Sequence, residues 1–289
     1  MNRREFLTAG VAITGAAFAT RMSAPLFAAT TQKHANDSIL LGPMKVPVTR
    51  LAMGTGTNGS GGSSDQTRKL GLGGVADLLE AACDQGVTFW DSADQYGSHP
   101  HLKEGLKRVP REKVTILTKT HASTEKEALA DIDRFRREIG TDYLDILLLH
   151  CMLDDRWPDQ KKGAMAAIEE ARVKGIIKTH GVSCHTLGAL KAAAINPWVQ
   201  VDLARINPAG MIMDADVPTV LSVLRQMKAA GKGVIGMKIL GAGGLSNRVD
   251  EALQYALSLD CIDCFTIGSE SRGQFQDLLK RIPAASARA

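Results

Sequence analysis

The chain alternates short apolar segments with longer amphipathic ones eight times, and this alternation constrains its fold more than any other feature. The apolar segments have the length of buried strands and lie at residues 50–53, 88–90, 114–118, 146–149, 179–182, 201–206, 233–237 and 264–267. Helical periodicity marks intervening segments such as 75–85, 124–139, 163–174, 218–230 and 274–280. Alternating strands and helices build a parallel sheet, because each helix returns the chain to the same end of the sheet.

Eight such units predict a closed (β/α)8 barrel, the TIM-barrel fold, and an open doubly wound sheet is the alternative. We favour the barrel because polar, reactive residues recur directly after one strand after another, as a ring of loops at the carboxyl ends requires. Residues 39–41 and 46–49 flank Gly42-Pro43 and predict a hairpin before the first barrel strand. Residues 54–74 are rich in glycine and serine and predict a mobile loop over the barrel mouth.

The first residues predict an export signal. Arg3-Arg4 precedes Phe6-Leu7 and an apolar run over residues 7–19, which is too short to span a bilayer as a mature helix. The pattern resembles the bacterial twin-arginine signal. It implies export to the periplasm through the twin-arginine machinery, with no stable membrane anchor on the mature protein. Proteins on this route often fold around a cofactor before they cross the membrane.

Small residues allow cleavage after Ala19 or after Ala28, and the second position lies at the more usual depth. A signal peptide over residues 1–28 leaves 261 of the 289 residues for one barrel domain, 29–289. That length is close to the roughly 250 residues of a typical barrel. The formal charge of the whole chain is +4, which is too small to indicate a nucleic acid partner. The five cysteines are too few and too scattered for a disulfide scaffold.

Four residues suited to proton transfer follow three successive predicted strands. Asp91 and Tyr96 follow the second strand, Lys119 ends the third, and His150 ends the fourth. A free tyrosine has a pKa of about 10 and gives up its proton reluctantly. A nearby lysine can stabilise the phenolate, an aspartate can hold the lysine, and a histidine can orient a carbonyl oxygen. Singly, each residue has an ordinary structural interpretation; together they can donate a proton to a substrate carbonyl.

The motifs around these residues resemble those of the aldo-keto reductases. The resemblance is carried by Asp91-Ser92-Ala93-x-x-Tyr96-Gly97, by Thr118-Lys119 and by Leu149-His150, and it extends from about residue 39 to about residue 279. It implies an NAD(P)H-dependent barrel enzyme that reduces an aldehyde or a ketone to an alcohol. In this interpretation Tyr96 is the general acid, Lys119 lowers its pKa, Asp91 pairs with Lys119, and His150 positions the small-molecule carbonyl substrate.

The same resemblance implies a cofactor site for NADPH or NADH. The residues that match the family's cofactor contacts are Gly54, Thr55, Ser183, Met237, Gly268, Ser269 and Arg272. Three positions depart from the family pattern around the nicotinamide. Cys184 stands where the family has asparagine, Leu203 where it has glutamine, and Met237 where it has a tyrosine that stacks on the ring.

The phosphate clamp of the family also differs in this chain. Glu270 replaces its arginine, and Arg272 is the cation that remains nearby. A carboxylate repels a 2′-phosphate, whereas an arginine can pair with it. We therefore expect the affinities for NADH and NADPH to lie within about tenfold of each other.

Two other functions are weighed against carbonyl reduction. The altered nicotinamide contacts allow a cofactor-binding regulatory subunit with little turnover. A metal-dependent hydrolase would need several ligands at strand ends, and only His150 and Asp91 are so placed, so no metal site is predicted.

Two groups of apolar or sulfur-bearing residues complete the sequence-based predictions. Cys261 and Cys264 have the spacing of a redox pair, but their position at the start of a strand predicts buried, inert thiols. Residues 151–153 and Trp157 suggest an apolar substrate pocket without naming the substrate.

Overall fold

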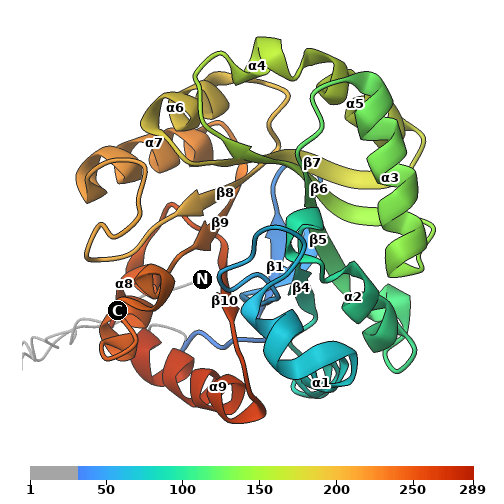
Figure 1. Cartoon of the computed structure of the whole chain (residues 1–289). Coiled ribbons are helices and arrows are strands. Elements are labelled where there is room, and N and C mark those ends of the chain that lie inside the picture. The colour runs from blue at the N-terminus through green and yellow to red at the C-terminus, as the bar shows by residue number, and fades with distance from the viewer. Residues whose placement is uncertain (1–31) are drawn as a thin grey trace, which may run out of the picture. The chain divides into compact units, whose positions relative to one another are not determined.

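A computed structural model describes residues 32–289, and in it the alternating segments form a closed barrel of eight parallel strands (Figure 1). The first and last strands of the barrel, at residues 51–54 and 264–268, pair directly with each other, which closes the barrel. The predicted barrel is therefore confirmed, and the alternative of an open sheet is wrong. Around the barrel the strands are β3 (Leu51–Gly54), β4 (Phe89–Asp91), β5 (Thr115–Thr120), β6 (Leu144–Met152), β7 (Ile177–Cys184), β8 (Val201–Arg205), β9 (Gly233–Met237) and β10 (Cys264–Gly268). The predicted signal peptide at residues 1–28 lies outside the described residues.

Helices surround these strands, and an apolar core fills the space between the two layers. The helices are α1 (Asp65–Asp84), α2 (His99–Leu106), α3 (Glu125–Ile139), α4 (Trp157–Gln160), α5 (Lys162–Val173), α6 (Leu187–Ile195), α7 (Val217–Ala229), α8 (Val249–Ser258) and α9 (Arg272–Ser286). The helical segments named from the sequence do not include α2, α4, α6 and α8, which are short. Helix α6 is also apolar on most of its faces, so its periodicity is weak. Among the described residues, none of the helices is both long and apolar enough to span a membrane.

Helix α1 begins at Asp65, well before the predicted start at residue 75. Ser64 caps it: the Ser64 side chain accepts a hydrogen bond from the Thr67 N–H, and the Ser64 N–H donates to Thr67 Oγ1. Gly71 has a φ of 63° and kinks the helix. The predicted mobile loop over residues 54–74 is therefore wrong in its second half, where glycines weaken the helical signal.

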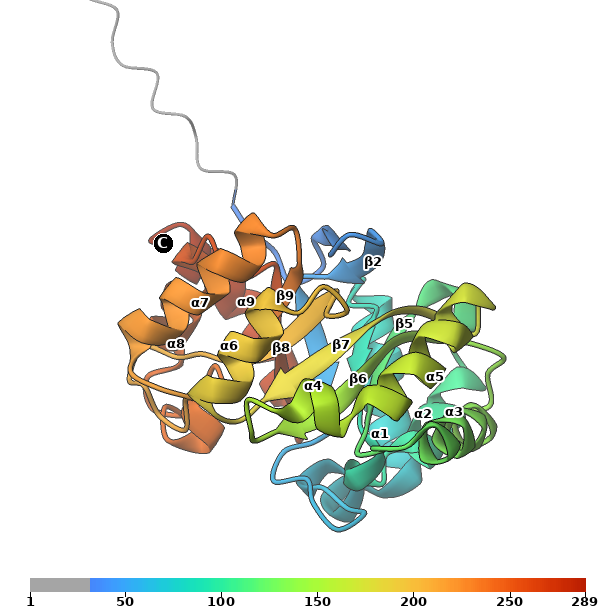
Figure 2. The same cartoon turned by 90° about the horizontal axis from the view of Figure 1, so that it is seen from above.

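A hairpin closes the amino end of the barrel. Its strands β1 (Ser38–Leu41) and β2 (Val46–Thr49) pair antiparallel, as the sequence predicts. Leu41, Val46 and Val48 pack against the apolar layer inside the barrel. Figure 2 shows the hairpin and the loop after β3 at opposite ends of the barrel. A site open to a ligand therefore lies at the carboxyl end.

The barrel interior is layered, because every second residue of a strand points inward. Phe89, Leu117 and Leu148 belong to the apolar inner layer on β4, β5 and β6. Two residues further along these strands stand Asp91, Lys119 and His150. The register pairs Asp91 with Leu117 and Lys119 with Leu148, so each of these polar residues lies beside an apolar residue of the next strand, as the stagger of a barrel requires.

Candidate active site

Lys119 and Asp91 form a buried ion pair at the carboxyl end of the barrel. The Lys119 side chain is fully buried, and its Nζ donates to Asp91 Oδ1 at 2.5 Å and to the Ser92 carbonyl oxygen at 2.7 Å. Thr266 Oγ1 on β10 donates to Asp91 Oδ2 at 2.8 Å. A buried ammonium requires such partners, because desolvation of an unpaired charge is costly. Thr266 was not among the residues predicted from the sequence, although the two-residue period of a strand indicates its inward position on β10.

Tyr96 ends a single 3-10 turn, Asp94–Tyr96, that follows β4. Lys119 Nζ lies 4.8 Å from the centroid of the Tyr96 ring. The loop after β3 presses on the same ring: a Cβ at Gly56 or Gly59 would come within 2.2 or 2.4 Å of its carbon atoms. Only glycine permits so close an approach, so this loop covers Tyr96.

The electrostatics of this pair keep the phenol protonated and the lysine charged. Burial raises the pKa of the Tyr96 phenol, and the Lys119 ammonium is the largest opposing influence. Burial alone would lower the pKa of Lys119, but Asp91 and Tyr96 outweigh it, and the net shift is upward. Tyr96 therefore holds a proton at neutral pH, beside a fixed positive charge that stabilises the phenolate once the proton leaves.

His150 lies beside Tyr96 as a neutral imidazole. The two ring centroids are 5.7 Å apart with nearly perpendicular planes, and the His121 ring stacks on His150 at 4.8 Å. Burial lowers the pKa of His150 to about 2, with smaller contributions from Lys119 and His121. Its Nδ1 is buried and has no hydrogen-bond partner among residues 32–289. A neutral imidazole can donate a hydrogen bond to a carbonyl oxygen without competing as an acid.

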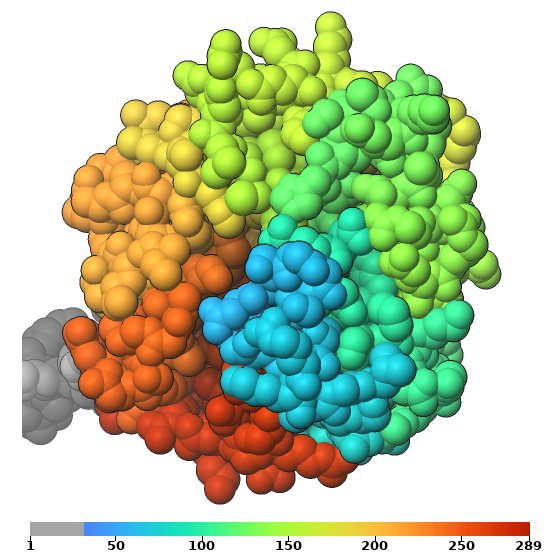
Figure 3. Space-filling model, viewed as in Figure 1, coloured from blue at the N-terminus to red at the C-terminus, as the bar shows by residue number. Residues whose placement is uncertain are grey.

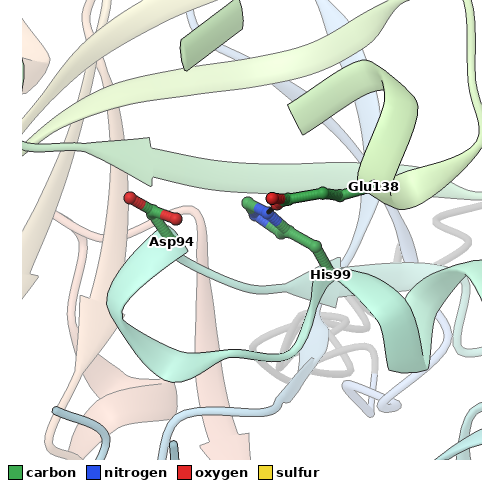
Figure 4. A group of neighbouring side chains, drawn as sticks. All are labelled: Asp94, His99 and Glu138. Atoms are coloured by element: carbon green, nitrogen blue, oxygen red, sulfur yellow. Dashed lines mark hydrogen bonds and ion pairs between the residues drawn. The ribbon is translucent and has the colours of Figure 1, made fainter. Parts of the chain in front are cut away.

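Behind Tyr96, the side chains of Asp94, His99 and Glu138 come close enough to hold a cation (Figure 4). Arg134 on α3 already supplies positive charge there. Its guanidinium donates to the two Asp94 oxygens at 2.7 and 2.8 Å and to Glu138 Oε1 at 3.2 Å. The bidentate contact ties the turn that contains Tyr96 to helix α3.

The same network reaches the strand that carries Lys119. His99 lies between Glu138 and Thr118, with ring nitrogens 2.8 Å from Glu138 Oε2 and 2.7 Å from Thr118 Oγ1. Thr120 Oγ1 donates to Asp131 Oδ2 at 2.5 Å. Side chains on both sides of Lys119 are therefore tied to α3.

A cavity of about 530 Å³ is lined by Asp91 and Tyr96 and by residues at the start of α9. Figure 3 shows the hollow between the blue-to-cyan segment after β3 and the orange-to-red segments near the carboxyl terminus. Asp91 and Tyr96 line one end, and Glu270 and Gln274 line the other. The volume falls in the range of small-molecule sites.

The predicted cofactor residues divide into two groups. Gly54, Met237, Gly268 and Ser269 line the cavity. The other three do not. Thr55 is buried, with its Oγ1 donating to the Asp91 carbonyl oxygen at 2.9 Å, and Ser183 Oγ accepts a hydrogen bond from the Cys151 N–H. Arg272 is turned toward α1 and donates to the Asp77 carbonyl oxygen at 3.3 Å.

The residues at the cavity fit a dinucleotide. Ser269 Oγ is buried and has no hydrogen-bond partner within the described chain, so a polar ligand group would satisfy it. A Cβ at Gly268 would come within 2.3 Å of Thr57 Oγ1 and 2.6 Å of Gln66 Nε2. The side chains of Thr57 and Gln66 therefore pack closely on the end of β10, where only glycine fits.

The residues that suggested an apolar substrate pocket, 151–153 and Trp157, do not line the cavity. Trp157 is 1% exposed, donates from Nε1 to the Ala189 carbonyl oxygen, and packs against Trp198 in the core. Leu153 is 63% exposed. Cys151 is half-buried, and its Sγ lies 3.0 Å from His185 Nδ1. The sequence suggested that Trp157 lines a pocket, but it lies in the core. A large aromatic side chain after a strand fits either environment.

Cys261 and Cys264, the possible redox pair, are both free and buried. Burial raises the pKa of both thiols. Both are therefore protonated at neutral pH and poorly nucleophilic.

A match to a protein-family model shows which family the chain belongs to. The family model described as the aldo/keto reductase family matches residues 50–272. The chain belongs to the aldo/keto reductase family. The structure of a member from Bacillus halodurans in its holo form superposes with a TM-score of 0.69 at 16% identity, covering 87% of this chain and 94% of that one. At that identity the likeness concerns the fold alone.

Among curated members of the family, the chain is similar to the D-threo-aldose 1-dehydrogenase of a Pseudomonas species. The two are 24% identical over 202 residues, which cover 58% of this chain and 60% of the relative. The NAD/NADP-dependent indole-3-acetaldehyde reductase of Schizosaccharomyces pombe is 28% identical over 169 residues, covering 55% and 56%. The chain thus spans a little over half the length of these two relatives.

Proposed function

We propose that this aldo/keto reductase reduces an aldehyde or a ketone to an alcohol with NADH or NADPH. The observation that carries the proposal is the contact between the protonated Tyr96 and the buried Lys119–Asp91 pair at one end of the cavity. The relatives' names include a dehydrogenase and a reductase dependent on NAD and NADP, which supports the same chemistry.

The residues of the chain have separate tasks in this reaction. The reduced nicotinamide supplies the hydride when it is bound. Tyr96 donates its proton to the carbonyl oxygen, and Lys119 stabilises the phenolate that remains. Asp91 holds Lys119, while His150 donates a hydrogen bond that orients the carbonyl. Gly54, Met237, Gly268 and Ser269 would hold the cofactor.

The test is the oxidation of NADH and NADPH by purified mature protein with a panel of aldehydes and ketones, followed by absorbance. We expect oxidation that depends on the carbonyl compound. Tight cofactor binding without turnover would favour the regulatory subunit instead. A protein that binds neither cofactor would contradict both proposals.

We further propose that NADH binds at least as tightly as NADPH. Three carboxylates line the end of the cavity near α9, those of Asp65, Glu270 and Asp277. Arg272 is engaged by α1, so the cation expected to favour a 2′-phosphate points elsewhere. Lys69 stands near this end, but it is paired with Glu270 at 2.7 Å. The charges at this end of the cavity therefore favour NADH over NADPH, whereas the sequence alone predicted similar affinities for the two cofactors.

We also propose, from the sequence of residues 1–28, that the protein is exported. Arg3-Arg4 and Phe6-Leu7 support a twin-arginine signal and a periplasmic location. Replacing both arginines by lysine should keep the protein in the cytoplasm with its amino-terminal segment uncleaved. Unchanged recovery from the periplasm would contradict the proposal.

A further inference from the structure

Lys238, which follows β9, is a cavity-lining residue whose charge has no counter-charge among residues 32–289. It is the only cationic side chain in the described lining of the cavity. Its ammonium makes no ion pair and no hydrogen bond within that part of the chain. Each lining carboxylate, in contrast, is paired with a basic side chain: Asp65 with Arg68, Asp91 with Lys119, Glu270 with Lys69 and Asp277 with Arg281. The missing counter-charge of Lys238 can come from a bound ligand.

The charged neighbours of Lys238 place it at the proton-donating end of the cavity. Burial lowers the pKa of its ammonium, Arg205 and Lys119 lower it further, and Asp91 raises it. Asp91 and Tyr96 line the cavity together with Lys238. Lys238 therefore lies near the place where the carbonyl group of a substrate would meet Tyr96.

The backbone fixes the position from which the Lys238 side chain extends. Its φ is 57°, in the left-handed region that favours glycine. Its carbonyl oxygen accepts hydrogen bonds from the Gly241 N–H at 2.8 Å and from Asn207 Nδ2 at 3.3 Å, which hold this conformation. A residue held in a strained conformation at a cavity is typical of a functional position.

The other basic groups near Lys238 offer no charge that an anion could use. Arg205 is paired with Asp214, whose Oδ1 accepts a hydrogen bond from Arg205 Nε at 3.0 Å. Burial lowers the pKa of His150 to about 2 and that of His185 to about 4, so both imidazoles are neutral at pH 7. An anionic group bound at this end would therefore pair with Lys238.

We propose that Lys238 binds a carboxylate of the carbonyl substrate, so that aldehyde acids or keto acids are the preferred substrates. This inference rests on the proposed function, in which the substrate carbonyl lies beside Tyr96. The reduced nicotinamide is uncharged, so at this end of the cavity the substrate is the ligand that can bring a negative charge. One unpaired ammonium matches one carboxylate, and a charge-assisted hydrogen bond between them would orient the carbonyl toward Tyr96.

The test compares matched acids and methyl esters as substrates at saturating NADH. The pairs are glyoxylate, 4-oxobutanoate and 4-formylbenzoate, each with its methyl ester, so that the spacing between carbonyl and carboxylate varies. We expect at least one acid to be reduced with a kcat/KM about 10- to 100-fold above that of its ester, the usual range for a charge-assisted hydrogen bond. The difference should appear mainly in KM.

Variants of Lys238 test whether this residue causes the preference. Lys238→Met should lower the ratio of the two kcat/KM values, acid over ester, by about 10- to 100-fold, with little change in the Kd of NADH. Lys238→Arg keeps the charge and should retain most of the ratio. Lys191→Met, at an exposed position on α6, is the matched control and should keep the ratio of the parent. Thermal melting of each variant verifies that the barrel has folded.

Three results would overturn the inference while leaving the proposed function intact. The first is a parent protein that reduces every ester as efficiently as its acid. The second is a Lys238→Met variant that keeps the ratio of the parent. The third is a Lys238→Met variant that keeps this ratio but binds NADH much more weakly, which would assign Lys238 to the cofactor. A parent protein that oxidises neither NADH nor NADPH with any carbonyl compound would instead contradict the proposed function, and the inference with it.

Discussion

The two sides of the barrel mouth differ in how their polar groups are satisfied. On the side of β4 and β5, Lys119 and Asp91 are paired, and the turn of Tyr96 is tied to α3 through Arg134. On the side of β9 and β10, Lys238 and Ser269 Oγ have no partner within residues 32–289. The difference teaches that the polar groups around Tyr96 are organised within the protein itself, whereas those on the side of β9 and β10 leave hydrogen-bonding capacity for a ligand.

The largest effect should come from removing the charge of Lys119. We expect Lys119→Met to lower kcat by about 10²- to 10⁴-fold, because Lys119 is the main influence that opposes the raised pKa of Tyr96. The single variant leaves Asp91 buried without its partner, which destabilises the fold. The double variant Asp91→Asn, Lys119→Met removes both charges and should fold yet remain slow. A fast double variant would show that the pair plays no part in proton donation.

A smaller effect should follow from loosening the turn that carries Tyr96. Arg134→Met removes the bidentate contact to Asp94. We expect kcat to fall by about 10- to 100-fold with little change in the Kd of NADH, since a misplaced acid costs rate rather than cofactor binding. Arg134→Lys should recover part of the rate. Arg137→Met, an exposed position on the same helix, is the matched control. A change in cofactor affinity with normal kcat would place the role of Arg134 elsewhere.

The smallest effect concerns the choice of cofactor. Glu270→Arg adds a cation beside the adenosine end of the cavity and frees Lys69 from its ion pair. We expect the ratio of the Kd values to shift toward NADPH by about tenfold, or about 1.4 kcal/mol. Glu112→Arg makes the same charge change at an exposed position outside the cavity and should leave the ratio unchanged. A hundredfold preference of the parent for NADPH would mean that Glu270 does not face the 2′-phosphate.

The sequence predicted the positions of Asp91, Lys119 and His150 better than the side chains that surround them. Asp91, Lys119 and His150 were readable because each ends an apolar strand, and the two-residue period of a strand then fixes the direction of its side chains. Arg134 and Lys238 carried no comparable signal. The contact of Arg134 with Asp94 depends on α3 packing beside the Tyr96 turn, and the place of Lys238 in the cavity lining depends on the folded barrel. Neither is a property of local sequence.

The differences between the sequence-based predictions and the structure have equally specific causes. The start of α1 was missed because Gly71, Gly73 and Gly74 weaken its helical pattern, while the cap at Ser64 is a short signal inside a serine-rich stretch. Arg272 was expected near the phosphate because it lies at the start of α9. Its side chain instead reaches the Asp77 carbonyl on α1, a contact that only the packed structure reveals.

The most direct test of proton donation by Tyr96 is a single-turnover measurement with NADH deuterated at the transferred position. Enzyme, labelled NADH and an accepted aldehyde are mixed, and the product alcohol is analysed for deuterium. In the parent we expect one deuterium on the former carbonyl carbon, and in Tyr96→Phe the same NADH affinity with a rate lower by about 10²- to 10⁴-fold. Equal rates in the two proteins would contradict the assignment of Tyr96 as the proton donor.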